Sequence, residues 1–325
     1  AGTAGAAGSA GSSSAGWLYT QGNLIKLDDG DGNVANDTTV ILHGVSLIDI
    51  TTVSTDGGYQ AQLDRAAQWN VNVVRMPVYA DNQLHGDTKP LPGGWTVAKA
   101  DTLVTTYLDP AIQYAKSKGM YVIVDLHYIT DVSAGDQYDT MAKAFWSDMA
   151  PRWADDPKVL YEVFNEPINT GGSQDWNAWK PLAQGYVDII RASAPKNLVL
   201  VGAPHWDQLM GGCNDNPITG GNVVYVGHIY GWHYDGTEGT TFDSSVLDCH
   251  ATYPMMLTEW GADTWSIGHA DHIKSLIKDN GLSFTAWAFH NAWGPAMFSG
   301  GTDNVPSTWN VTPYGTFVQN LLAEY

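Results

Sequence analysis

Eight short apolar segments recur along the chain, and each is apolar nearly throughout instead of alternating with polar residues. Such segments are typical of parallel strands that are covered on both faces of a sheet. We predict strands at residues 40–45, 71–77, 121–127, 159–165, 198–202, 223–229, 255–259 and 284–289. A chain with this pattern is limited to α/β folds built around a parallel sheet.

Helical segments lie between the predicted strands, so the chain contains eight successive strand-then-helix units. Predicted helices include residues 60–69, 100–118, 138–153, 176–193 and 271–280, and Asp109–Pro110 marks a kink or a new start within the second. Eight such units predict a single-domain (β/α)₈ TIM barrel. The alternative, a doubly wound sheet, usually has a glycine-rich phosphate loop after its first strand, and none follows residues 43–47.

The N-terminal stretch differs in composition from the rest of the chain. Residues 1–16 are almost entirely Ala, Gly, Ser and Thr, which form flexible linkers and no core. We therefore expect a tail at 1–16, once joined to another module, and the barrel domain at 17–325. Apolar residues 24–27 and 39–42 flank a turn-rich stretch, 28–33, and predict a short N-terminal β-hairpin.

The charge balance is strongly acidic, with 15 Lys and Arg against 34 Asp and Glu and a net charge of -19. Such a surface repels nucleic acid and anionic membranes and suits a neutral partner. No apolar run approaches the roughly 20 residues that span a bilayer. We therefore expect no nucleic acid or membrane as a partner.

The two cysteines and the aromatic residues point to the compartment and the partner. Cys213 and Cys249 both lie in loop-like sequence, so a disulfide in a secreted protein is expected, with two free buried thiols as the alternative. No signal peptide or initiator Met is present, which suggests a mature or trimmed form. Many of the 14 Trp and 16 Tyr lie near Gly, Pro, Asn or Asp, where amphipathic rings suit sugar faces as well as protein interfaces.

Polar side chains gather where the predicted strands end, which is where barrels carry their catalytic groups. These residues are Arg75, His127, Asn165, Glu166, His228, Tyr230, Glu259 and Trp287. Glu166 closes the fourth predicted strand and Glu259 the seventh, so the two carboxylates are expected to face each other across the barrel mouth. Glu162 lies on the same predicted strand as Glu166, and we interpret it as a buried structural carboxylate.

Two facing carboxylates without a surrounding cluster of Cys or His ligands indicate glycoside hydrolysis. The alternative is a metal site, but Mg²⁺ barrels gather three or more acids at adjacent strand ends, and the ends between these two offer Gly202, His228 and Tyr230. We therefore predict neither a metal nor another cofactor.

The ordered set of motifs resembles glycoside hydrolase family 5, the cellulase and mannanase family. The motifs are Val-Arg-Met-Pro at 74–77, Asp-Leu-His at 125–127, Asn-Glu-Pro at 165–167, His-Ile-Tyr at 228–230, Thr-Glu-Trp-Gly at 258–261, and Trp287. The resemblance covers 17–325, the whole chain except the tail. It implies a retaining mechanism in which Glu166 is the general acid/base and Glu259 the nucleophile.

The resemblance also implies roles for the supporting residues. Arg75 and Tyr230 would hold the nucleophile, and Asn165 would meet the sugar 2-hydroxyl. His127 and His228 would line the cleft, and Trp287 would form the floor under the sugar at the cleaved bond. Simpler alternatives are a structural ion pair for Arg75, core packing for the histidines and barrel filling for Trp287.

Aromatic residues in loops favour a polysaccharide in an open cleft over a small glycoside. Candidate outer subsites are Trp95, Trp176, Trp206, Trp232, Trp265 and Trp293, although Trp176 and Trp179 could equally anchor their helix. The run at 162–167 looks more like cellulases than mannanases, so we predict an endo-β-1,4-glucanase. The alternatives are an endo-β-1,4-mannanase, an exo-β-glycosidase and a non-catalytic carbohydrate-binding barrel. We expect a secreted monomer whose tail joined a carbohydrate-binding module.

Overall fold

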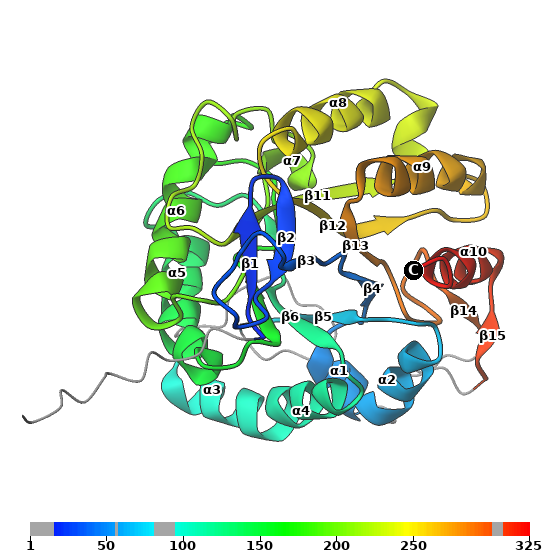
Figure 1. Cartoon of the computed structure of the whole chain (residues 1–325), viewed down its shortest axis with the longest axis horizontal. Helices are drawn as coiled ribbons and strands as arrows, with labels where there is room; N and C mark the ends of the chain where they lie inside the picture. The colour runs from blue at the N-terminus through cyan, green and yellow to red at the C-terminus, as the bar shows by residue number, and fades with distance from the viewer. Residues whose placement is uncertain (1–15, 56–57, 81–94, 301–307) are drawn as a thin grey trace, which may run out of the picture.

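The computed structural model describes residues 16–55, 58–80, 95–300 and 308–325. Its centre is a closed barrel of eight parallel strands in the order β10-β11-β12-β13-β4-β5-β6-β8 (Figure 1). The barrel strands are β4 (His43–Ser46), β5 (Val73–Val78), β6 (Tyr121–Leu126), β8 (Val159–Glu162), β10 (Val199–Val201), β11 (Val223–Tyr230), β12 (Met255–Gly261) and β13 (Ser283–Ala286). The predicted (β/α)₈ barrel is confirmed.

Helices surround the barrel and cover the outer face of its strands (Figure 1). They are α1 (Ile50–Thr55), α2 (Tyr59–Ala67), α3 (Val97–Leu103), α4 (Asp109–Ser117), α5 (Gln137–Met149), α6 (Trp176–Ser193), α7 (Pro204–Asp207), α8 (Glu238–His250), α9 (Ala270–Asn280) and α10 (Pro313–Leu322). Every residue of β5 and of β6 is buried, which explains why these strands are apolar except at Arg75 and Asp125.

The predicted helix at 100–118 is two helices joined by a π-helical turn, Val104–Leu108, and Asp109–Pro110 starts the second of them. Proline is well suited to the first turn of a helix, where its missing N–H has no intrahelical partner. The predicted helix at 176–193 matches α6. Among the described residues, α1, α7, α8 and α10 are helices that the sequence pattern did not identify.

The fourth barrel strand ends earlier than predicted, at Glu162. After it the chain leaves the barrel sheet and forms β9 (Glu166–Pro167), which pairs in parallel with β7 (Ile129–Thr130). The backbone N–H of Glu166 donates to the Tyr128 carbonyl. This small sheet fixes the backbone of Glu166 beyond the end of β8.

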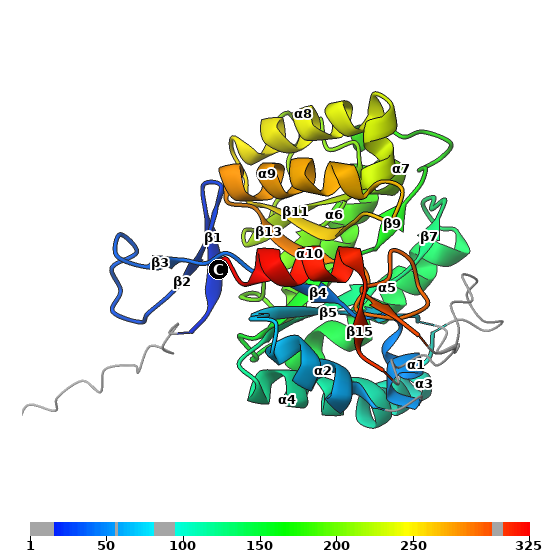
Figure 2. The ribbon, with the colours of Figure 1, turned by 90° about the vertical axis from the view of Figure 1, so that its right-hand side faces the viewer.

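The N-terminal hairpin is part of a three-stranded antiparallel sheet of β1 (Leu18–Gln21), β2 (Leu24–Leu27) and β3 (Thr38–Thr39). The sequence pattern identified β2 and β3 but not β1. Buried residues of this segment, Leu18 and Ile25, pack with barrel residues such as Ile123 and Leu200. Figure 2 shows the sheet at the end of the barrel opposite β7 and β9. It therefore closes the N-terminal end and leaves the other end for a site.

The predicted tail lies almost wholly outside the described residues, which begin at Gly16. Within the described ranges, no helix is long and apolar enough to span a membrane. A further short antiparallel sheet, β14 (Phe298–Ser299) with β15 (Asn310–Val311), follows the last barrel strand.

Candidate active site

The two predicted catalytic glutamates lie together at the C-terminal end of the barrel. Glu259 is on β12 and Glu166 begins β9. One carboxylate oxygen of each, together with a ring nitrogen of His228, forms a group whose atoms all lie within 4.8 Å of one another. Retaining glycosidases have carboxyl groups about 5 Å apart, whereas inverting enzymes need a wider gap for a water molecule. The short distance therefore suits a retaining mechanism.

A local irregularity places His228 beside Glu259. The register between β11 and β12 shifts at Gly227 and His228, after which His228 is the strand partner of Glu259. Such bulges are common next to active sites because they change the direction of a side chain. The shift gives His228 contact with both glutamates.

Each oxygen of the Glu259 carboxylate accepts a hydrogen bond. Arg75 donates from Nη1 to Oε1 at 2.6 Å, and the Tyr230 hydroxyl donates to Oε2 at 2.5 Å. Burial alone would raise the pKa of Glu259, but the charges of His228 and Arg75 outweigh it and hold the pKa below its ordinary value. The carboxylate is thus kept ionised and oriented.

Arg75 is fully buried and forms ion pairs with three acidic side chains at and beneath the site. Its guanidinium pairs with Glu162 at 2.7 Å, with Asp125 at 2.9 Å and with Glu259. Burial tends to raise the pKa of Glu162, but Arg75 and His228 lower it to about 2. Glu162 is therefore a buried structural carboxylate, as the sequence predicted.

Asn165 is held by the same guanidinium and lies in the turn between β8 and β9. Its Oδ1 accepts from Arg75 Nη2 at 2.6 Å. Its Nδ2 has no hydrogen-bond partner among the described residues, although it is buried. A buried amide without a partner retains a donor for a ligand hydroxyl.

His228 holds Glu166 from the opposite side. Its Nδ1 lies 2.8 Å from Glu166 Oε1, and its Nε2 lies 2.8 Å from the hydroxyl oxygen of Thr258. The Thr258 hydroxyl donates in turn to Glu162 at 2.8 Å. The two glutamates are thus held by different partners, Glu259 mainly by Arg75 and Tyr230, and Glu166 by His228.

Trp287 follows β13 and packs on His127. The two rings are stacked, with centroids 5.6 Å apart and planes 8° apart. His127 Nδ1 lies 2.7 Å from Asp125 Oδ2. This histidine therefore contacts a carboxylate that also pairs with Arg75. The ring of Trp287 is largely buried, and the structure brings it close to the groups beneath the site.

A pocket of about 340 Å³ lies beside Glu166 and His228. Two tryptophans predicted as outer subsites, Trp206 and Trp232, contribute to its wall. The sequence pattern did not identify its polar lining, which is His205, Gln208, His233 and Glu238. These residues lie in short helical turns, in the residue after one, or at the start of α8, so no periodic signal marks them.

The other predicted outer subsites differ in exposure. Trp232 stacks on Tyr230 with centroids 4.5 Å apart and contacts Trp265 at 6.2 Å. Trp265 is 66% exposed and Trp293 is 39% exposed. Tyr230, Trp232 and Trp265 therefore form a row of rings that runs from the nucleophile to the surface, here called the aromatic row.

Trp176 is mostly buried, with only 4% of its surface exposed, which agrees with the alternative that it anchors its helix. Its Nε1 donates to the Asn216 carbonyl at 2.8 Å, and its ring packs on Tyr225. It therefore anchors α6. Trp95 is partly buried against Phe145 of α5, so it also packs in the helical layer.

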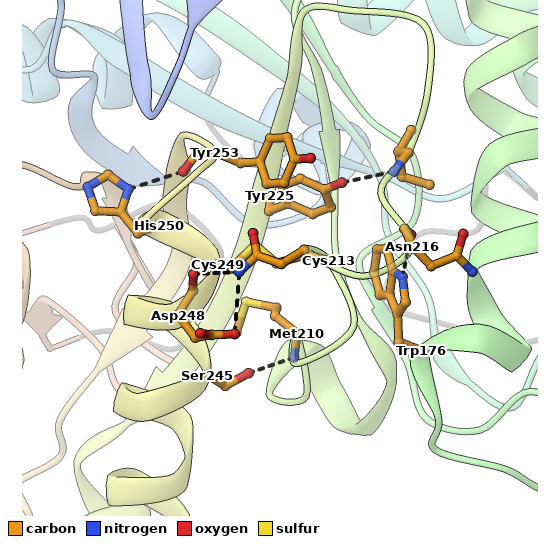
Figure 3. The surroundings of a disulfide bond; sticks show 12 residues. Trp176, Met210, Cys213, Asn216, Tyr225, Ser245, Asp248, Cys249, His250 and Tyr253 are labelled. Atoms are coloured by element: carbon orange, nitrogen blue, oxygen red, sulfur yellow. Dashed lines mark hydrogen bonds between the residues drawn. A yellow bond between two sulfur atoms is a disulfide. The ribbon is translucent and has the colours of Figure 1, made fainter.

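Cys213 and Cys249 form a disulfide between the segment after α7 and the end of α8 (Figure 3). The same two segments are joined by a hydrogen bond from the Met210 N–H to the Ser245 hydroxyl at 2.9 Å. The disulfide therefore fixes the chain that begins with Trp206 in the pocket wall.

Three groups of acidic and histidine side chains have the spacing of metal ligands among the described residues. They are Glu162, Asp207 and His228; Glu166, His228 and Glu259; and Asp28, Asp29 and Asp37. The first two groups share His228, and Arg75 and Thr258 already occupy oxygens of Glu162. In the first two groups, most of the ligand atoms are thus engaged in ion pairs and hydrogen bonds with other side chains.

Comparison with known proteins gives relatives over most of the chain. Endoglucanase A of Evansella cellulosilytica is 27% identical over 268 residues, which are 79% of this chain and 51% of the relative. Endoglucanase E-5 of Thermobifida fusca is 24% identical over 303 residues, which are 88% of this chain and 59% of the relative. The chain thus spans between half and three fifths of these relatives' length.

Solved structures share the fold. The native form of β-glucanase SdGluc5_26A from Saccharophagus degradans superposes with a TM-score of 0.77 at 23% identity, covering 95% of this chain and 94% of that chain. The family model for cellulase, glycosyl hydrolase family 5, matches residues 34–292. This match includes both glutamates and every residue that holds them, and the chain therefore belongs to glycosyl hydrolase family 5.

Proposed function

We propose that this chain is a retaining endo-β-1,4-glucanase. One observation carries the proposal: an oxygen of each of two carboxylates lies within 4.8 Å of the other, and different neighbours hold the two carboxylates. Arg75 and His228 lower the pKa of Glu259, as a nucleophile requires. Glu166 has no arginine or lysine ion pair among the described residues, and its partner is His228, a side chain that can itself carry a proton.

The reaction proceeds in two steps, formation of a glycosyl-enzyme intermediate and its hydrolysis. First, a Glu259 oxygen bonds to the anomeric carbon, the bond from that carbon to the leaving oxygen breaks, and Glu166 gives this oxygen its proton. Second, a water molecule attacks the same carbon, the bond to Glu259 breaks, and Glu166 takes a proton from the water. Asn165 Nδ2 is available to donate to the sugar 2-hydroxyl, and Trp287 offers the ring for the sugar face.

A β-glucan is favoured over a β-mannan as the substrate. The relatives described above are named endoglucanases, and SdGluc5_26A has been solved in complex with cellotetraose. The aromatic row leads away from the nucleophile toward the surface, which supports a cleft for a chain and hence endo action. Mannanase activity is the second candidate, and a substrate panel decides between them.

We also propose that the protein is secreted. The disulfide of Cys213 and Cys249 supports this, because disulfides persist in oxidising compartments. Expression of the full-length gene in its natural host, followed by detection of the protein in the medium and in the cells, tests it. Retention inside the cells would contradict the proposal.

The roles of the glutamates are tested by chemical rescue on an aryl β-cellobioside with a good leaving group. Glu259→Ala should be inactive, and azide should restore turnover to give the α-glycosyl azide. Glu166→Ala should give the β-glycosyl azide, because its nucleophile is intact. The opposite pair of products would reverse the roles, and no rescue in either variant would contradict the double displacement.

The endo assignment is tested on soluble substituted cellulose. We expect viscosity to fall faster than reducing ends accumulate. A fall in viscosity that is only proportional to the increase in reducing ends would contradict endo action, and so would the release of glucose alone. A panel of cellulose, mixed β-glucan, xylan and mannan identifies the substrate, and a higher kcat/KM on mannan would make the protein a mannanase.

A further inference from the structure

Asp207 lies directly behind the active site on an unusual turn. His205, Trp206 and Asp207 have φ angles of 61°, 54° and 58°, a left-handed conformation that is unfavourable for residues other than glycine. Three such residues in succession are kept only where the surroundings require them, commonly near functional sites. Here the turn places Trp206 in the pocket wall and Asp207 in the interior.

The interior around Asp207 is shaped to hold its carboxylate. A Cβ atom on Gly202 would collide with both carboxylate oxygens of Asp207, so the absence of a side chain at this position makes room for the group. Oδ1 accepts from the Ala203 N–H at 2.8 Å. Oδ2 has no hydrogen-bond partner among the described residues and lies 3.6 Å from His228 Nε2.

The hydrogen bonds of His228 restrict where its protons lie. The Thr258 hydroxyl gives its only proton to Glu162, so its oxygen accepts from His228 Nε2, which must carry a proton. The opposite nitrogen, Nδ1, faces Glu166 Oε1 at 2.8 Å. A further proton therefore lies between His228 and Glu166, and its position depends on the charges around the imidazole.

Those charges come from every element that packs around His228. Four acidic side chains face the imidazole directly: Glu162 of β8, Glu166 of β9, Asp207 of α7 and Glu259 of β12. Two further charged or titratable groups, Arg75 of β5 and His127 after β6, act on Glu259. Arg75 already pairs with Glu162 and Glu259. Asp207 has no arginine or lysine partner among the described residues, so His228 is the cation that it faces.

We propose that Asp207 is a positioning residue for Glu166, the general acid/base, and that it acts through His228. It holds the proton of the His228–Glu166 pair, so that Glu166 remains a working acid at higher pH. The proposal rests on the proposed function of Glu166. Burial lowers the pKa of His228, but Glu259 and Asp207 raise it well above the ordinary value overall. Burial raises the pKa of Asp207 itself.

The titration of Asp207 and that of the His228–Glu166 pair are coupled, and the negative charge of ionised Asp207 sets the sign of the coupling. Once Asp207 is ionised, its negative charge makes the His228–Glu166 pair release its proton at a higher pH. Replacing Asp207 with a neutral residue removes that charge. The pair should then lose its proton at a lower pH.

The first test compares kcat/KM against pH for the wild-type chain and Asp207→Asn, which keeps the shape of the side chain. We expect the alkaline limb to move down by about one pH unit, with a smaller change in the acid limb. Asp207→Leu, which adds no new donor toward His228, should move it in the same direction. Asp155→Asn, an exposed change before β8 and thus at the other end of the barrel, should leave the profile unchanged.

The second test separates proton donation from general damage. Asp207→Asn should slow hydrolysis of an aryl β-cellobioside with a poor leaving group by about tenfold more than one with a dinitrophenyl group, which leaves without a proton. Equal losses on both substrates, with an alkaline limb that coincides with wild type, would mean that Asp207 is only structural and would overturn the proposal.

A third measurement does not depend on activity. The ¹⁵N NMR titration of His228 should show a lower pKa in Asp207→Asn than in wild type. If the wild-type chain hydrolyses none of the glucans or cellobiosides, the proposed function fails, and this titration still decides whether Asp207 and His228 are coupled. An unchanged His228 pKa would overturn the inference even in an active enzyme.

Discussion

The guanidinium of Arg75 binds both carboxylate oxygens of Glu162, through Nε at 2.7 Å and Nη2 at 3.1 Å, where neither side chain is exposed. The remaining nitrogen, Nη1, is directed at Glu259. Glu162 thus orients the guanidinium and leaves one nitrogen for the nucleophile. Stability and catalysis depend on the same buried ion-pair network.

Arg75→Ala should be strongly destabilising because it leaves Glu162, Asp125 and Glu259 buried without their cation. The expected loss is about 3–5 kcal/mol in the free energy of unfolding, measured with urea. Arg152→Ala is the matched control: Arg152 also binds two carboxylates, but its pair with Asp101 is exposed. It should lose at most about 1 kcal/mol, and equal losses would contradict the assignment.

Acid should weaken the fold through Glu162. Its pKa of about 2 in the folded chain lies below the ordinary value of 4.5, so its contribution is complete above pH 4.5 and is lost as pH falls toward 2. Glu162→Gln should be less stable at pH 6 but should show a shallower fall below pH 4.5. Asp155→Asn, at an exposed position before β8, should keep the wild-type slope. Parallel curves for Glu162→Gln and wild type would refute this.

Gly202→Ala should destabilise the protein because the new methyl group collides with the Asp207 carboxylate. We expect a loss of about 1–3 kcal/mol and an alkaline limb shifted as in Asp207→Asn. Gly185→Ala, within α6 and with open space around the added atom, should gain about 0.5–1 kcal/mol. Thermal unfolding of both variants checks the contrast, and a neutral Gly202→Ala would contradict the packing described.

The disulfide should contribute substantially to stability. Cys213 and Cys249 are separated by 36 positions, and closing a loop of that size is worth about 3–4 kcal/mol through the unfolded chain. The double variant Cys213→Ala/Cys249→Ala should lose this amount in urea unfolding. Dithiothreitol should lower the stability of the wild type under unfolding conditions and leave the double variant unchanged. If dithiothreitol leaves the stability of the wild-type chain unchanged, this result would contradict the disulfide.

Trp265→Ala should affect long substrates selectively. The ring is the exposed end of the aromatic row, and stacking of this kind is worth about a threefold to tenfold change in affinity. We expect a higher KM on β-glucan polymer, with kcat and the activity on aryl cellobiosides unchanged. Leu247→Ala, an exposed apolar position on α8, should change neither. A loss on short substrates too would remove Trp265 from the subsites.

The local pattern of the chain was sufficient to predict the eight strands and the barrel. Mainly apolar runs such as 121–127 and 223–229 form strands because burial on both faces favours apolar residues at most of their positions. The same pattern predicts that Glu166 and Glu259 lie at one mouth of the barrel, since parallel strands bring their carboxyl ends together there, although Glu166 lies on β9, beyond the end of β8. These are properties that short segments and their order encode.

The tertiary structure alone decided which polar and aromatic residues share an environment. The sequence does not separate Trp176 from Trp265, yet packing on Tyr225 buries the first and leaves the second exposed. Asp207 has no signal in the sequence, because its place depends on a left-handed turn and on the space above Gly202. The order of the strands predicts that the two glutamates lie at the same end of the barrel. The charges that set their pKa values come from residues distant in sequence, and only closure of the barrel brings those residues together.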